Sequence, residues 1–331
     1  MVSYITRISA RWLARFRTRK PETDLVTRSR LTLFRLIAAL RVLQFPLKLK
    51  QLWSLNFMRS FFPNKSKPDT FFFLSHEHYL SRNLTLAQRV DCAINHYRFE
   101  GQNYGSTYHR SVYQSPHGLV LWHRIVEGTR YTIALRATED NRHEGDLSIL
   151  CFVNETRVCR VSFSYVDSSL FGLRSECTMF VTRNQTDRNP ALQRFRDSFK
   201  QNSPPYFCLA SVWGIAMANG MRDIFLVKDD AQIAYQERYA EGFRNSYSAF
   251  WETFGAQEID GGHAYAMSIP PRLNPLAIVG HRNRAVARRK HWQEVALSAR
   301  QAMLKERTSW APRPIDAEAL ALLMPAHREP Q

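Results

Sequence analysis

The chain has 331 residues, 44% of them hydrophobic, and a formal net charge of +17. This composition excludes a disordered or collagen-like chain and is sufficient for one large folded domain. The five cysteines form no CxxC pair and no zinc-type spacing, so we expect neither a disulfide framework nor a metal site.

Most of the positive charge lies in residues 1–67, which hold 15 Lys and Arg against two acidic residues. In residues 4–20, apolar side chains recur every three or four positions and arginines recur every four positions, which predicts a basic amphipathic helix. The residues expected to contact an anionic membrane surface are Arg7, Arg11, Trp12, Arg15 and Phe16. Nucleic-acid binding and packing on the body of the protein are the alternatives. Nucleic acid is the weaker one, because no helix-turn-helix, zinc-finger or ribonucleoprotein motif is present.

A polar, proline-bracketed stretch at residues 63–69 predicts a linker after this N-terminal segment. We therefore divide the chain into a basic helical segment (1–67), a body (68–300) and a polar tail (301–331) that follows the basic stretch 282–290. No stretch has the ~20 uncharged apolar residues of a membrane span. Residues 1–20 also lack the continuous apolar core of a secretory signal, which predicts a cytoplasmic protein.

The body begins with a helix after Thr85, because Thr85 and Gln88 form a capping-box pattern before a run with helical periodicity. Two strand-like stretches follow, at residues 117–126 and 130–138. A β-hairpin is then predicted for residues 144–166.

The register of that hairpin follows from its alternating apolar residues, because a slip by one residue would turn them to the opposite face. Pairing about Glu155 sets the following residues opposite each other: Leu147 and Phe163, Ile149 and Val161, and Cys151 and Cys159. We expect two packed thiols at the last pair, because a reducing cytoplasm disfavours a disulfide.

The second half of the body predicts a strand at residues 177–183 and a helix that Asn189 and Pro190 begin. A further helix follows the prolines at 204 and 205 and ends near Gly220. Its small residues Ala210, Gly214 and Ala218 form a stripe on which another backbone can lie closely.

A buried strand at 222–227, an aromatic-rich helix that ends at Gly255, and two short strands around residues 260–262 close the body. This order predicts an α/β (α+β) chain with a mixed, largely antiparallel sheet and flanking helices. The order also resembles the fold of the GCN5-related N-acetyltransferases, which implies an acyltransferase-like domain.

Five stretches in this order resemble the VirK/YbjX family of Gram-negative bacterial proteins. They are HYRFEG (96–101), HEGDLSILCF (143–152) followed by VSFSY, TRNQ (182–185), KDDAQIAYQERY (228–239) and YSAFWETFGA (247–256). The resemblance implies a role in envelope integrity, surface virulence factors or tolerance of antimicrobial peptides, and it implies no known reaction. Together with the basic amphipathic segment at residues 1–67, this predicts a peripheral protein on the inner face of the inner membrane. At TRNQ this sequence lacks the glycines that usually flank the motif in the family, which argues against a phosphate-cradling loop there.

Acyltransferases of the resembled fold hold the pyrophosphate of coenzyme A on backbone N–H groups at a helix N-terminus. Pro204 and Pro205 occupy the corresponding place here and lack two of those N–H groups. Ordinary acetyl-CoA binding is therefore not expected, and the cofactor stays unidentified. The alternatives are an acyl or aminoacyl donor bound at a shifted position, and no donor at all.

Four residues are candidates for chemistry. Glu144 lies where a loop enters the hairpin and could be a general base toward an amine, although such residues are often only solvated strand ends. His96, beside the apolar face of its helix, is the second catalytic candidate, with a packing role as its alternative. Arg183 and Gln185 could hold an anionic or carbonyl group of a substrate, or simply cap a loop. The function predicted is acyl or aminoacyl transfer to an envelope component, and its rival is a non-catalytic membrane-binding protein with the same fold.

Overall fold

The computed structural model describes residues 41, 44–61, 73, 76–139, 142–200, 202–259, 264–269 and 282–308. The predicted membrane-binding helix, with Arg7, Arg11, Trp12, Arg15 and Phe16, lies outside the described residues, as does the tail beyond residue 308. Among the described helices, none is both long enough and apolar enough to cross a bilayer.

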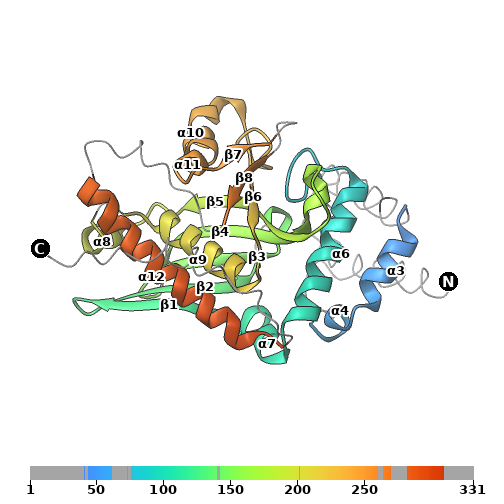
Figure 1. Cartoon of the computed structure of the whole chain (residues 1–331), viewed down its shortest axis with the longest axis horizontal. Coiled ribbons are helices and arrows are strands. Elements are labelled where there is room, and N and C mark those ends of the chain that lie inside the picture. Colours follow the sequence, from blue (N-terminus) through green and yellow to red (C-terminus); the bar gives the residue numbers. More distant parts are fainter. Residues whose placement is uncertain are drawn as a thin grey trace, which may run out of the picture.

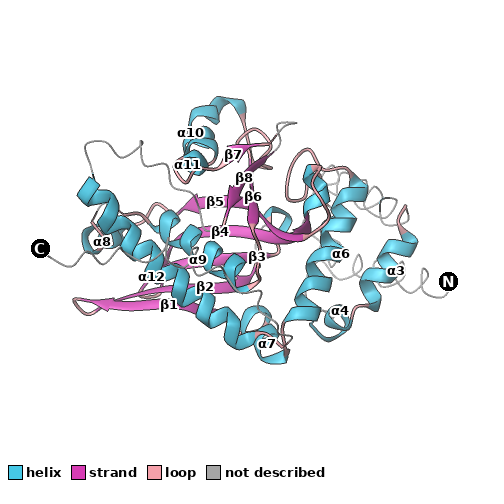
Figure 2. Cartoon of the chain, viewed as in Figure 1, coloured by secondary structure: helices cyan, strands magenta, loops and turns pink. Residues whose placement is uncertain are grey.

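An eight-stranded sheet forms the centre of the structure (Figures 1 and 2). Its strands are β1 (Leu119–Val126), β2 (Thr129–Ala137), β3 (Leu147–Val153), β4 (Thr156–Asp167), β5 (Cys177–Thr186), β6 (Asp223–Val227), β7 (Gln257–Glu258) and β8 (Ala264–Ser268). They lie in the order β1-β2-β3-β4-β5-β6-β8-β7. All neighbouring pairs are antiparallel except β5 and β6, which are parallel. The predicted mixed, largely antiparallel sheet is confirmed.

Helices flank this sheet, as predicted. They are α3 (Pro46–Ser54), α4 (Asn56–Phe61), α6 (Leu86–Asn103), α7 (Ser106–Tyr113), α8 (Pro190–Ser198), α9 (Pro204–Ala218), α10 (Ala240–Ser246), α11 (Ser248–Glu252) and α12 (Arg282–Glu306). Figure 1 shows α9 and α12 crossing the sheet, α3, α4 and α6 at one end of it, and α10 and α11 beside β7 and β8. The capping box at Thr85 and the Asn189 cap form as predicted at the starts of α6 and α8.

The β3–β4 hairpin has the predicted register, with Leu147 opposite Phe163 and Cys151 opposite Cys159. Its turn needs no glycine because Asn154 adopts the left-handed conformation, with φ of 53°. All five cysteines are free thiols. Burial raises the pKa of Cys208, in α9, whose thiol lies within hydrogen-bonding contact of the two hairpin thiols. Three thiols therefore pack together in the core.

Helix α9 lies between the sheet and α12, so nearly all of its residues are buried. A Cβ added at Gly214 would lie 2.3 Å from the backbone oxygen of Ala296 in α12, so this glycine allows the close approach that the small-residue stripe predicts. The sequence did not predict the partner helix α12, because residues 282–290 were recognised only as a basic stretch.

Part of the basic N-terminal segment packs on the body. Helices α3 and α4 bury Leu49, Leu52 and Phe57, and the Phe57 ring stacks on Tyr97 of α6 with 5.7 Å between centroids. Lys48 forms an ion pair with an aspartate of α6 at 2.7 Å. The described residues 44–61 are thus integrated into the core, and α12 continues six residues past the predicted body, to Glu306.

Candidate functional site at the opening of the sheet

Strands β5 and β6 separate at their carboxyl ends. They pair only through Phe180 with Phe225 and Val181 with Leu226, while β5 runs on along β4 to Thr186. The end of β6 is held elsewhere, because the indole of Trp251 donates a hydrogen bond to the carbonyl oxygen of Val227 at 2.9 Å. Openings at the carboxyl ends of parallel strands are common ligand sites in α/β proteins.

A β-bulge connects the loop before β3 to this opening. The β4–β5 register shifts so that Thr182 has no partner residue in β4, and its hydroxyl donates a hydrogen bond to the carbonyl oxygen of Glu144. The next residue, Gly145, has φ of 139°, and an added Cβ there would lie 2.9 Å from the backbone nitrogen of Phe163. Glycine therefore lets the loop lie directly on β4 and turns Glu144 toward the opening.

Glu144 is only 6% exposed, and both of its carboxylate oxygens have a donor. One oxygen forms an ion pair with the guanidinium of Arg183, and the other accepts a hydrogen bond from Gln232 at 2.9 Å. Arg183 also donates to the side-chain oxygen of Gln185. The structure thus brings three of the four predicted site residues together. Gln232 was missed, although it lies in one of the five stretches that carry the family resemblance.

Asn184 completes the opening from the other side of β5. Its amide nitrogen donates to the carbonyl oxygen of Ser246 at 2.8 Å, and its backbone nitrogen lies 3.4 Å from the hydroxyl of Tyr247. Its side-chain oxygen is buried and accepts no hydrogen bond from the described part of the chain. Burial raises the pKa of Tyr247, so its hydroxyl stays protonated. The opening therefore contains a free amide acceptor beside a neutral phenol.

His96 lies in a different polar cluster, between α6 and β4. Its Nδ1 accepts a hydrogen bond from the backbone nitrogen of Tyr165 at 3.2 Å, and its Nε2 lies 3.4 Å from the hydroxyl of Tyr113. The ring has no exposed surface, and burial lowers its pKa, so the imidazole is neutral. These bonds connect His96 to β4 and α7 and not to Glu144. This geometry favours the packing role.

Asp146 anchors the loop that carries Glu144. Its fully buried carboxylate accepts hydrogen bonds from Tyr79 at 2.6 Å, from Tyr97 at 2.7 Å and from Ser164 at 2.6 Å. Next to Tyr79, Leu80 has φ of 60° in a tight turn, an unfavourable conformation for a leucine. Strained residues of this kind cluster at functional sites, because the surrounding contacts must hold them in place.

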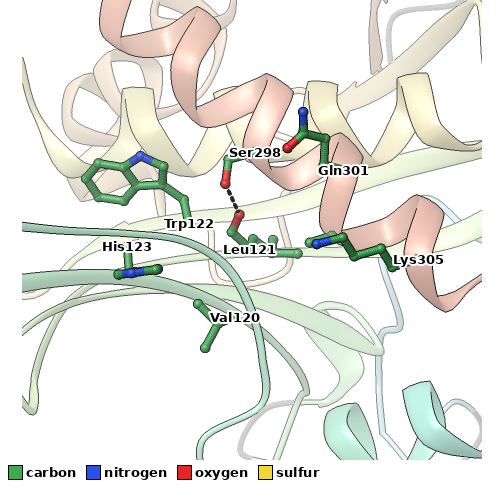
Figure 3. Close-up of a pocket in the computed structure, with 8 residues that line it drawn as sticks. Val120, Leu121, Trp122, His123, Ser298, Gln301 and Lys305 are labelled. Atoms are coloured by element: carbon green, nitrogen blue, oxygen red, sulfur yellow. Dashed lines mark hydrogen bonds between the residues drawn. The ribbon is translucent and has the colours of Figure 1, made fainter.

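A hollow lies between the edge strand β1 and α12 (Figure 3). It is lined by Val120, Leu121, Trp122, His123, Ser298, Gln301, Ala302 and Lys305. None of these is an acid, and Ser298 donates its hydroxyl to the carbonyl oxygen of Leu121 at 2.7 Å. The described residues contain no cluster of ligands suited to a metal ion. The opening beside Glu144 is therefore the better candidate for chemistry.

The fold and this opening define an α/β protein with a buried carboxylate–guanidinium pair at the ends of two parallel strands. The chain belongs to the VirK/YbjX family, since the family model described as "Protein of unknown function (DUF535)" matches residues 48–294. No curated protein and no solved structure matches the chain.

The stretches that carry the family resemblance meet around the opening. Residues 143–152 supply Glu144, residues 182–185 supply Arg183, and residues 228–239 supply Gln232. Residues 247–256 contact Asn184 through Tyr247, and residues 96–101 contact Asp146 through Tyr97. Segments far apart in the sequence therefore build one site.

Proposed function

We propose that this protein transfers an acyl or aminoacyl group to an amine of an envelope component in Gram-negative bacteria. The observation that carries the proposal is the buried carboxylate of Glu144, held at the opening by Arg183 and Gln232. The order of elements in the sequence, which resembles that of the acyltransferase fold, motivates the proposal, because donor and acceptor meet where the sheet of that fold opens.

In this proposal the amine nitrogen attacks the carbonyl carbon of the donor. A C–N bond forms, and the bond from that carbon to the sulfur or oxygen of the carrier breaks. Glu144 takes the proton that the nitrogen loses and returns it to the leaving atom. Arg183 and Gln185 hold the polar group of the donor. A donor that draws the guanidinium of Arg183 away from Glu144 leaves the carboxylate able to accept the proton.

The donor is identified by ligand-dependent stabilisation. Helix α9 begins with Pro204 and Pro205, which have no backbone N–H to donate, so this helix end is a poor pyrophosphate site. We expect acyl carrier protein or aminoacyl-tRNA, and not acetyl-CoA, to raise the melting temperature. Binding at 100 times the dissociation constant adds about 2.7 kcal/mol of stability.

The controls for this experiment are unacylated carrier protein and deacylated tRNA, which have the same phosphate groups without the transferred group. A larger shift with the acylated forms supports transfer. Equal melting temperatures with and without every donor would favour the rival, a non-catalytic membrane-binding protein.

We further propose that residues 1–40 hold the protein on the inner membrane. The full chain is expected to bind vesicles of anionic lipid and to release them as salt rises, because exposed charges are screened. The deletion should stop at residue 40, since residues 46–61 pack on α6. Sedimentation of vesicles measures the effect. Full binding by the truncated chain, or equal binding to neutral vesicles, contradicts this proposal, and comparable affinity for random DNA supports the nucleic-acid alternative.

A further inference from the structure

A cluster of basic side chains adjoins the loop that carries Glu144, and we call this set the basic rim. Its members are Arg41, His76, His78, Arg82, Arg89 and His143. The rings of His76 and His143 stack with 4.5 Å between centroids, and His143 directly precedes Glu144. Burial, and then the neighbouring His76 and Arg183, lower the pKa of His143 to about 4. The rim therefore adjoins the guanidinium that holds the Glu144 carboxylate.

The basic rim concentrates positive charge with few counter-ions. Arg41 and Arg89 both donate to one carbonyl oxygen, that of His76, at 3.2 Å and 3.3 Å. Burial, and then Arg41, lower the pKa of Arg89, and Glu77 partly opposes this. Glu77, whose side chain is 85% exposed, lies 3.7 Å from Nε2 of His78, and the carboxylate of Glu144 is already paired with Arg183. Guanidinium groups held this close repel each other, and a bound anion would relieve the repulsion.

The rim has accessible donors for such an anion. His76 and Arg82 are exposed, and the guanidinium of Arg82 lies 5.9 Å from the ring centre of Tyr235, with a 3.4 Å hydrogen bond to its carbonyl oxygen. The low pKa of His143 leaves its imidazole neutral, so it can donate an N–H without adding to the repulsion. Guanidinium groups match phosphate oxygens with paired donors.

We infer that the basic rim binds a phosphate group, either a phosphate ester or a diphosphate, of the molecule that enters the Glu144 site. The inference rests on the proposed function, because that function is what brings a substrate into the Glu144 site. The basic rim would provide the phosphate contact that the two prolines at the start of α9 do not provide. The phosphate belongs either to a soluble carrier or to a lipid headgroup, and both sources have the same chemistry at the rim.

Calorimetric titration of the full chain with inorganic pyrophosphate tests the soluble source. Arg82→Gln and His143→Asn are each expected to weaken binding about tenfold, because each removes a hydrogen bond to a charged ligand. Arg238→Gln is the matched control, since Arg238 is an exposed arginine that lies over the Tyr239 ring, and it should keep the wild-type affinity. The basic N-terminal segment is identical in all variants, so any pyrophosphate that it binds contributes equally to every titration.

Vesicles of phosphatidylglycerol and phosphatidylcholine test the lipid source with the same variants. A dependence on Arg82 for pyrophosphate, for phosphatidylglycerol or for both supports the inference and identifies the source. Unchanged affinity of Arg82→Gln for both ligands overturns it, even where His143→Asn fails to fold.

Glu144→Gln separates the rim from the proposed reaction. Loss of this carboxylate leaves more positive charge at the entrance, so pyrophosphate should bind several-fold more tightly while transfer is lost. Tighter pyrophosphate binding with full cellular activity would refute the proposed reaction but not the phosphate binding by the basic rim. Loss of activity in Glu144→Gln together with equal binding by the rim variants and wild type would refute the rim alone.

Discussion

Glu144→Gln is expected to abolish the cellular activity of this protein while the chain stays folded. Glutamine has the same shape and can still bond Gln232, but it cannot accept a proton from an amine. It also leaves the guanidinium of Arg183, which is 12% exposed, without its anion, so the melting temperature should fall while the chain remains folded. Loss of a general base lowers rates by ~10²–10⁴. Antimicrobial-peptide tolerance of a strain that lacks the protein, complemented with each variant, measures the activity, and the melting temperature of purified protein measures folding.

An alanine substitution would test activity at an exposed arginine, but Arg183 is paired with a buried carboxylate and needs a milder change. Arg183→Ala leaves the buried Glu144 carboxylate without its cation, and breaking a buried pair in this way costs about 3–5 kcal/mol. Arg183→Lys keeps the charge and loses the planar pair of donors, so we expect lost activity with a smaller loss of stability.

Asp91→Asn is the control for both variants, because it removes an acid paired with Lys48 at 2.7 Å, on α6. This control should complement fully. If it fails as Glu144→Gln does, the loss reflects damaged folding. If Glu144→Gln complements, the catalytic assignment is wrong and the non-catalytic alternative is favoured.

The second large effect is a loss of stability as pH rises, caused by Glu100. Burial raises the pKa of this carboxyl from 4.5 to about 8, although hydrogen bonds from Tyr108 and Tyr113 oppose the shift. The folded state therefore keeps a proton that the unfolded state releases. The stabilisation is fully present below pH 4.5 and declines by ~1.4 kcal/mol per pH unit until about pH 8.

Glu100→Gln is expected to remove this slope, because glutamine keeps the size and the hydrogen-bonding oxygen of the side chain and does not titrate. The variant should therefore be more stable than the wild type at pH 8. Urea unfolding at pH 5, 6, 7 and 8 provides the comparison. Glu139→Gln is the control, since the Glu139 side chain is 76% exposed and its ion pair with Arg136 lies on the surface. Identical slopes for wild type and Glu100→Gln would contradict the assigned shift.

Interactions between residues close in the sequence were sufficient to predict much of the fold. The capping box at Thr85 and the proline start at Pro190 depend only on neighbouring residues, and both helices begin there. The β3–β4 register was predictable because a slip by one residue would turn Leu147 and its apolar neighbours to the wrong face. The stripe around Gly214 likewise predicted a close approach, since a residue without a side chain leaves that space open.

The partners in these long-range contacts could not be predicted from local pattern. Helix α12 was missed because its closest contacts with α9, at Ala296 and Ala299, are made by small residues that give a weak apolar periodicity, although Trp292 also packs on α9. The sequence places His96 beside an apolar helix face. Only the structure shows that His96 is buried against β4 and is not part of the Glu144 site.

The candidate site depends on contacts across long stretches of chain. Glu144 and Arg183 are 39 positions apart, and Gln232 is 88 positions from Glu144. They meet because β6 leaves β5 after Leu226, where its next carbonyl bonds Trp251. The alternation of side chains along a strand is encoded locally, whereas the point at which two parallel strands part depends on what else packs against them.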